Sequence, residues 1–79
     1  MQIKVLFFGA TADIAGKRFE ELQIKEGATA KAVLAELFSR FPPLAAQKLH
    51  ISIDQEYARE DSIVKSGNEV AVFTAVSGG

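Results

Sequence analysis

The sequence predicts a single α+β domain in which a mixed sheet of four or five strands carries one main helix on one face. Three observations support this fold class. The chain has 79 residues, which is enough for one small domain and too few for two. Strand-like apolar segments occur near both ends of the chain, at residues 2–8 and 69–76. Only one segment, residues 29–41, has a long apolar stripe at helical spacing.

The first strand is expected at residues 2–8, where β-branched and aromatic side chains dominate. Successive side chains of a strand point to opposite faces, so Ile3, Val5 and Phe7 share one face. Lys4 belongs to the other face, which should be the less buried one because a lone ammonium group is costly to bury.

A short helical turn and a second strand are expected next. Thr11 or Asp13 is predicted to cap the turn, which ends at Gly16. Residues 17–24 form a weaker strand. Phe19 is out of phase with the other apolar positions of this segment, which predicts either a bulge or a strand that starts later.

The main helix is expected at residues 29–41, with Thr29 as the residue that caps its N-terminus. Glu36 and Arg40 lie one turn apart in the order that favours an ion pair. Two consecutive prolines at positions 42 and 43 end the helix, because the residue before a proline is pushed out of the helical region. The apolar stripe consists of Val33, Leu34, Leu37, Phe38 and Phe41.

The second half of the chain is predicted to add the remaining strands. Residues 49–53 alternate cleanly between apolar and polar types, which indicates a half-buried strand. A short strand is expected near Tyr57, and residues 69–76 are apolar nearly throughout, as in a central strand. We expect residues 1–76 to form the domain and residues 77–79 to form a flexible tail.

Strand alternation also predicts which side chains the single helix leaves uncovered. One helix covers only one face of the sheet, yet the first and last strands are apolar on both faces. An aromatic side chain has about 150–250 Å² of surface to bury, so three of them match much of one side of a standard interface, about 800 Å². We therefore predict that the uncovered face binds another protein. The side chains expected there are Leu6, Phe8, Ala71, Phe73 and Tyr57.

Composition narrows the classes of function. The chain has 9 basic and 10 acidic residues, for a formal net charge of −1, whereas a small nucleic-acid-binding domain would have a basic excess. No apolar run approaches the roughly 20 residues that cross a bilayer, so no membrane partner is expected. The absence of Cys excludes disulfides, thiolate zinc sites and a cysteine nucleophile. The N-terminal residues do not resemble a signal peptide, and we expect a cytoplasmic protein.

Internal residues offer little catalytic chemistry. Gly9 and Gly16 are separated by six residues where a phosphate-binding loop has four, and Arg18 stands where that loop needs Ser or Thr. His50 is the only histidine and has no carboxylate pair near it in sequence, so we interpret it as a surface or structural residue. No metal site is predicted.

The terminal pair Gly78-Gly79 is the sharpest functional feature. Two glycines without Cβ atoms make the thinnest and most flexible peptide tail. Such a tail can thread a narrow channel and present its terminal carboxylate to the active site of another enzyme. Because Ser77 and the glycines follow directly on a predicted central strand, the reach of the tail is limited and its aim is set.

Both ends of the chain resemble the MoaD family, the sulfur-carrying small subunits of molybdopterin synthase. The similarity lies in Ile-Lys-Val-Leu-Phe-Phe at residues 3–8, in Gly-Asn-Glu-Val-Ala-Val-Phe at 67–73, and in Val-Ser-Gly-Gly at 76–79. Two departures stand out. Ala-Asp-Ile occupies residues 12–14, where the family commonly has an Arg-Glu pair, and Ala75 stands where a proline is common.

This resemblance implies a ubiquitin-like β-grasp fold and a carrier that binds no cofactor of its own. It implies that an E1-like activating enzyme uses ATP to adenylate the Gly79 carboxylate and then converts it to a thiocarboxylate. The tail, with Ser77 and Gly78, would then enter the large subunit of molybdopterin synthase, which supplies the catalytic groups. There it would donate sulfur to a cyclic pyranopterin. The partner-binding residues that the resemblance and strand alternation together suggest are Leu6, Phe8, Tyr57 and Phe73.

Three alternatives remain open on the residues. One is a sulfur carrier of another pathway, such as thiamine thiazole synthesis, although those carriers are usually shorter and lack the long segment after Phe8. A second is a ubiquitin-like tag that forms isopeptide bonds through Gly79. The third is a plain interaction module that ends in Gly-Gly by chance.

Overall fold

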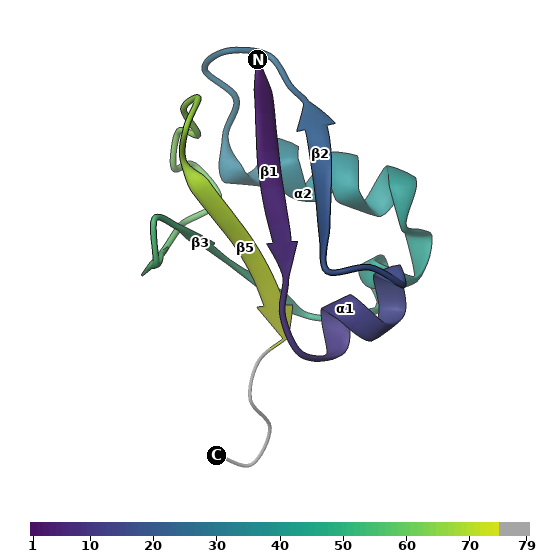
Figure 1. The fold of residues 1–79 in the computed structure, drawn as a ribbon. Coiled ribbons are helices and arrows are strands. Elements are labelled where there is room, and N and C mark those ends of the chain that lie inside the picture. Colours follow the sequence, from purple (N-terminus) through teal and green to yellow (C-terminus); the bar gives the residue numbers. More distant parts are fainter. Residues whose placement is uncertain (75–79) are drawn as a thin grey trace.

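The computed structural model describes residues 1–74 and shows one five-stranded sheet with a long helix across one face (Figure 1). The strand order is β2-β1-β5-β3-β4, with β1 and β5 parallel at the centre and the other pairs antiparallel. This confirms the predicted fold class, with five strands rather than four. The strands are β1 (Gln2–Phe7), β2 (Phe19–Gln23), β3 (Leu49–Ile53), β4 (Glu56–Tyr57) and β5 (Glu69–Thr74). The helices are α1 (Ala10–Ala15), α2 (Ala30–Arg40) and the 3₁₀ helix η1 (Pro42–Ala46).

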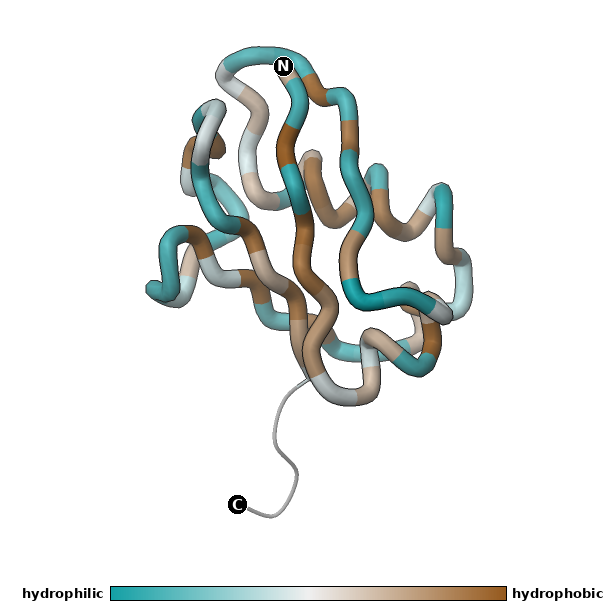
Figure 2. Tube along the Cα trace, in the orientation of Figure 1, coloured by the Kyte–Doolittle hydropathy of each residue, from teal (hydrophilic) through white to brown (hydrophobic). Residues whose placement is uncertain are grey.

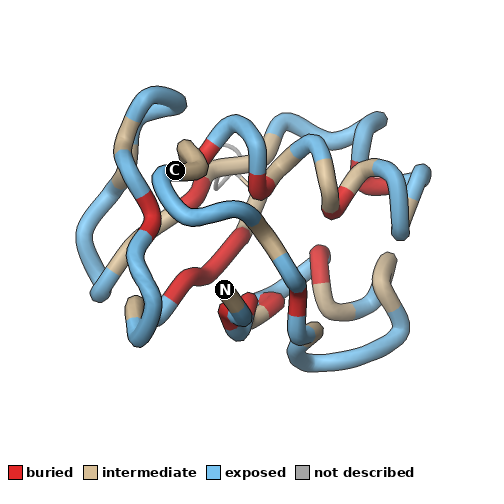
Figure 3. Tube along the Cα trace, turned by 90° about the horizontal axis from the view of Figure 1, so that it is seen from above, coloured by how far each residue is buried: buried red, intermediate tan, exposed pale blue. Residues whose placement is uncertain are grey.

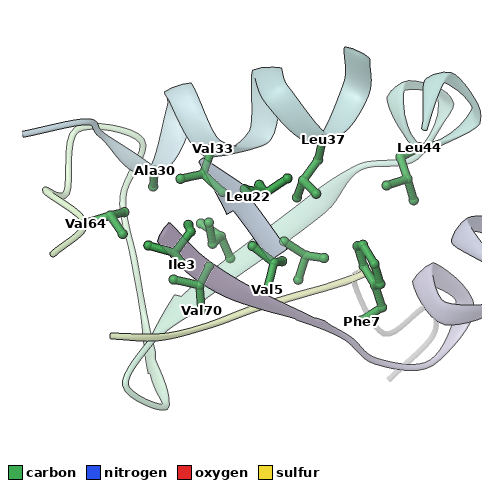
Figure 4. Close-up of a cluster of buried hydrophobic side chains, with 12 residues drawn as sticks. Ile3, Val5, Phe7, Leu22, Ala30, Val33, Leu37, Leu44, Val64 and Val70 are labelled. Carbon is green, nitrogen blue, oxygen red and sulfur yellow. The ribbon is translucent and has the colours of Figure 1, made fainter. Parts of the chain in front are cut away.

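The hydrophobic core lies between the sheet and α2 (Figure 4). Alternation in β1 buries Ile3, Val5 and Phe7, as predicted, and their neighbours on β5 are Val70 beside Val5 and Val72 beside Phe7. Figure 2 shows that hydrophobic residues are concentrated in the central strands, whereas the edge strand β2 is mostly hydrophilic. The buried residues gather inside the molecule and the loops at its periphery are exposed (Figure 3). The remaining members of the core are Leu22, Ala30, Val33, Leu37, Leu44, Ile51 and Val64.

The ends of α2 follow the sequence signals. The hydroxyl oxygen of Thr29 accepts a hydrogen bond from the Ala32 amide at 3.3 Å, which confirms the predicted N-cap. Arg40 Nε lies 3.2 Å from Glu36 Oε1, which confirms the ion pair. After Arg40 the chain changes to η1 at the two prolines, and this turn buries Leu44 against the core.

The short helix α1 begins differently from the prediction. Its N-cap is Gly9, and no side chain caps it, so the expectation of a cap at Thr11 or Asp13 is wrong. Gly9 has φ 58° and ψ −132°, a backbone conformation that essentially only glycine adopts, and it turns the chain into the helix directly after β1. Thr11 therefore lies inside the helix. The end at Gly16 is confirmed: this residue is left-handed and donates to the Ala12 carbonyl at 2.9 Å.

Strand β2 starts at Phe19 and pairs with β1 in a continuous register, with Leu6 opposite Phe19 and Ile3 opposite Leu22. The later start that was one of the two predictions is thus confirmed, and no bulge interrupts the paired residues. Phe19 is out of phase because it belongs to the face away from α2. There its ring centroid lies 4.3 Å from the Lys4 ammonium nitrogen, a cation–π contact.

Strands β3 and β4 form a tight hairpin through Asp54 and Gln55, which have φ of 52° and 69°. The Asp54 carboxylate accepts hydrogen bonds from the Glu69 amide and the Asn68 side chain, both at 2.8 Å, and so joins the hairpin to the start of β5. Strand β4 confirms the short strand expected near Tyr57. Among the residues that the structure describes, no helix is both long and apolar enough to cross a membrane.

Candidate functional site

The face of the sheet away from α2, here called the open face, carries three rings in mutual contact, of which those of His50 and Phe73 are stacked. His50 on β3 lies opposite Phe73 on β5, and Tyr57 on β4 lies opposite Ser52 on β3. The ring centroids of Tyr57 and Phe73 are 5.6 Å apart, those of His50 and Phe73 are 5.7 Å apart, and those of His50 and Tyr57 are 6.1 Å apart. We call His50, Tyr57 and Phe73 the aromatic cluster. Three adjacent strands thus supply one ring each.

The aromatic cluster is open to solvent to different degrees. The Tyr57 side chain is 78% exposed because β4 is the edge strand of the sheet, while His50 and Phe73 are half-buried. Aromatic pairs at these separations lie within the range in which rings attract each other. The cluster is therefore held together by its own contacts and still presents apolar surface to the outside, which is the arrangement expected of a contact surface.

Leu6 and Phe8 lie on the neighbouring strand and its continuation. Leu6 is half-buried and lies beside Ala71 of β5 on the open face, whereas Phe8 follows β1 and is 52% exposed. The Phe8 amide donates to the Val72 carbonyl at 3.1 Å, which fixes its backbone beside the end of β5. Ala71 is only 4% exposed, so it contributes almost no surface, contrary to the prediction that it lies open.

The structure thus brings Phe73 and Tyr57 together as predicted and places Leu6 and Phe8 on the adjacent strand. The sequence reasoning missed the third ring. The alternation of residues 49–53 did place His50 on the polar side of its strand, but its neighbour Phe73 depends on the pairing of β3 with β5. Within residues 1–74 the half-buried His50 ring lies beside the rings of Tyr57 and Phe73 and makes no ion pair, in keeping with a surface or structural role.

The ion pairs among the described residues lie away from the aromatic cluster. Glu20 on β2 lies 3.4 Å from Lys17 and 3.9 Å from Arg40, and Arg40 also meets Glu36. Of these partly exposed ion pairs, the one between Arg40 and Glu20 joins α2 to β2, at the opposite edge of the sheet from β4. Among residues 1–74, no three His, Asp or Glu side chains converge as metal ligands. The predicted tail residues Ser77, Gly78 and Gly79 lie outside the described residues.

A mixed sheet in the order β2-β1-β5-β3-β4, crossed by one helix, defines the ubiquitin-like β-grasp class. Solved structures agree with this assignment. Small archaeal modifier protein 1 from Haloferax volcanii has a TM-score of 0.86 at 24% identity, with complete coverage of both chains. A chain in the complex of subunits 1 and 2 of the molybdopterin-converting factor from Helicobacter pylori has a TM-score of 0.69 at 16% identity, again with complete coverage of both chains. At these identities the likeness establishes the fold.

The chain belongs to the ThiS family, whose model matches residues 5–79. It is 32% identical over 83 residues to the molybdopterin synthase sulfur carrier subunit of Chlamydomonas reinhardtii, with complete coverage of both chains. It is 31% identical over 83 residues to the protein of the same name from Homo sapiens, with coverage of 99% of this chain and 94% of the relative. The family expected from the two ends of the sequence is thereby confirmed.

Proposed function

We propose that this chain is the sulfur carrier subunit of molybdopterin synthase and acts in the biosynthesis of the molybdenum cofactor. The observation that carries the proposal is the full-length similarity to relatives of that name, at 32% and 31% identity. The β-grasp fold and the Gly78-Gly79 ending of the sequence are consistent with it. The function requires no nucleophile or base on this chain, since its reactive group is the carboxylate of Gly79.

The chemistry proceeds in two stages on that carboxylate. A Gly79 oxygen attacks the α-phosphorus of ATP and pyrophosphate leaves, so that a poor electrophile becomes a mixed anhydride. A sulfide nucleophile then attacks the carbonyl carbon and AMP leaves, which produces the thiocarboxylate. An E1-like activating enzyme binds the ATP, and this chain holds no cofactor. The thiocarboxylate then supplies sulfur to a cyclic pyranopterin inside the synthase.

The open face is proposed to contact both partners, the activating enzyme and the large subunit of the synthase. Tyr57, Phe73, Leu6 and Phe8 supply half-buried or exposed apolar surface, and interfaces are enriched in aromatic side chains. The Helicobacter pylori chain of similar fold is itself described in a complex of subunit 1 with subunit 2 of the molybdopterin-converting factor. We place the protein in the cytoplasm, where these partners would act.

Intact-mass measurement tests the proposed function. The chain is incubated with an activating enzyme, ATP and sulfide, and the expected product has one oxygen of Gly79 replaced by sulfur. A matched control variant has one alanine appended after Gly79 and should stay unmodified. The proposal fails if the wild-type chain shows no such replacement, or if the extended variant supports molybdopterin synthesis equally well.

Three further experiments separate the alternative functions. A thiocarboxylated chain that supplies a thiazole synthase and not the pterin-converting large subunit would be a carrier of another pathway. Conjugates of Gly79 with lysine side chains in a cell extract would indicate a protein-modifying tag. Full function after deletion of Gly78 and Gly79 would leave a plain interaction module.

A further inference from the structure

Thr11 is the one polar residue fully buried within the described part of the chain. It lies in α1, the short helix that follows β1, and Figure 1 shows α1 next to the end of β5. Buried hydroxyl groups require hydrogen-bond partners, because an unpaired one costs free energy. The partners of Thr11 therefore show what holds α1 in place.

The Thr11 hydroxyl lies 2.7 Å from the Phe8 carbonyl oxygen and 3.1 Å from the Val72 carbonyl oxygen. A hydroxyl group carries one proton, so the two carbonyl groups share a single donor. The first contact is the local bond that threonine often makes to a carbonyl one turn earlier. The second contact joins residues 61 positions apart in the sequence and needs this tertiary fold.

A backbone hydrogen bond joins the same two residues, Phe8 and Val72. The Phe8 amide also donates to the Val72 carbonyl, at 3.1 Å. Val72 thus accepts from the end of β1 and from α1 together, two residues before β5 ends at Thr74. These bonds attach β5 at Val72 on the side that faces β1, whose pairing with β5 ends at Phe7. On its other side, β5 is paired with β3 as far as Thr74.

We propose that Thr11 is a positioning residue whose hydroxyl holds the end of β5 against α1 and so fixes the point from which the chain continues beyond Thr74. The inference rests on the proposed function, because a fixed starting point matters where the carboxylate of Gly79 must reach another enzyme's active site. A fixed exit lowers the conformational cost of placing the carboxylate, which raises the rate of the step at that carboxylate. The Thr11 hydroxyl is not part of the aromatic cluster, so its removal should leave the binding of partner proteins to that cluster unchanged.

Three variants isolate the hydroxyl group. Thr11→Val keeps the shape of the side chain and removes the donor, Thr11→Ser keeps the donor and removes a methyl group, and Thr11→Ala serves if the valine variant does not fold. Amide hydrogen exchange is the first readout. We expect protection of the Phe8 amide to fall about 2–10-fold in Thr11→Val, the factor that one neutral hydrogen bond represents. The Asp54 amide, which donates to Glu69 at the other end of β5, should stay unchanged.

The kinetics of thiocarboxylate formation with the activating enzyme are the second readout. Thr11→Val should lower kcat about 2–10-fold with KM unchanged, and Thr11→Ser should restore kcat. The proposal is overturned if Thr11→Val matches wild type in kcat, or if valine and serine variants lose kcat equally, since packing would then matter and the hydroxyl would not. If the wild-type chain is not thiocarboxylated at all, the proposed function fails, and with it the positioning role. Hydrogen exchange then still shows whether the hydroxyl holds β5.

Discussion

Phe7 is the last residue of β1 and Phe8 follows it, and their side chains belong to opposite faces of the sheet. Phe7 is 3% exposed and meets Phe41 edge to face, with ring centroids 5.5 Å apart. Phe8 is 52% exposed and lies next to the end of β5. Burial of a phenylalanine contributes about 1.5–3 kcal/mol to folding, so Phe7 stabilises the fold while much of the surface of Phe8 still faces water.

The same contrast extends across the sheet. The face under α2 is buried, and its fully or nearly fully buried side chains are aliphatic apart from Phe7, with Phe38 and Phe41 packed against them. The open face carries the aromatic cluster, where rings touch each other and still face solvent. We infer that the first face determines stability and the second determines partner binding. Substitutions that affect one property without the other test this division.

The largest effect is expected from a cavity under α2. Leu37 is fully buried, so Leu37→Ala should lower the free energy of unfolding by about 2–5 kcal/mol. Phe8→Ala is the matched change on the other face, and its loss should stay under about 1 kcal/mol. Urea denaturation followed by circular dichroism measures both. Similar losses for the two variants would mean that the faces do not differ in their contribution to stability.

A substitution at Phe73 should weaken partner binding and leave the stability of the fold largely unchanged. Phe73→Lys places a charge inside the aromatic cluster, and we expect the affinity for the large subunit to fall at least 30-fold, about 2 kcal/mol. The fold should persist, because the lysine stem can follow the apolar surface while its ammonium group reaches water. Titration calorimetry measures the affinity, and circular dichroism checks the fold.

The control for Phe73→Lys is Gln23→Lys, which adds the same charge on the edge strand β2. This strand is separated by β1 from β5, which carries Phe73, and lies at the opposite edge of the sheet from β4, which carries Tyr57. The affinity of the control variant for the large subunit should equal that of wild type within about twofold. If Phe73→Lys is unfolded, Phe73 belongs to the core, and the division between the two faces is wrong.

A smaller effect is expected at Tyr57, the outermost ring of the cluster. Tyr57→Ala should weaken binding to the large subunit about tenfold, near 1.4 kcal/mol, since a ring at the rim contributes less than one at the centre. Stability should change by less than about 0.5 kcal/mol because the side chain is 78% exposed. A larger loss of affinity here than at Phe73 would move the centre of the interface to the edge strand.

The division between the faces was partly readable from the sequence. Alternation is a local property of a strand, so it assigned Ile3 and Val5 to the core correctly. Register is a long-range property, and the position of Phe19 became clear only when β2 was seen opposite Leu6. His50 was missed for the same reason, since its contact with Phe73 depends on the pairing of β3 and β5.

The short helix α1 shows a second limit. Its start depends on the backbone angles of Gly9, which glycine permits but which no sequence pattern predicts. The cap was therefore predicted at Thr11 or Asp13, and the role of Thr11 as a buried donor was missed. The terminal glycines could be singled out from the sequence because the chemistry proposed for them depends on residue type and position in the chain. It does not depend on how the strands pair. Their role as the site of sulfur attachment stays a prediction until the mass measurement is made.

The smallest effect is expected in the hairpin that carries Tyr57. Asp54 and Gln55 both have positive φ, as in the type I′ turn that joins two strands by two residues, and glycine is strongly preferred at the second position. Gln55→Gly should therefore raise the free energy of unfolding by about 0.5–1 kcal/mol, by removing the steric cost of a left-handed residue. Asp54 is left unchanged because its carboxylate bonds to Asn68 and Glu69.

This substitution is expected to stabilise the hairpin at the open face without altering a ring or a core residue. Urea denaturation should show the gain, and the affinity for the large subunit should match that of wild type within about twofold. Gln55→Ala is the control, since alanine also lacks the long side chain but keeps the Cβ atom that makes the left-handed conformation costly. An equal gain in both variants would attribute the effect to the glutamine side chain. A marked change in affinity would show that the hairpin's geometry, and with it the position of Tyr57, is adjusted on binding.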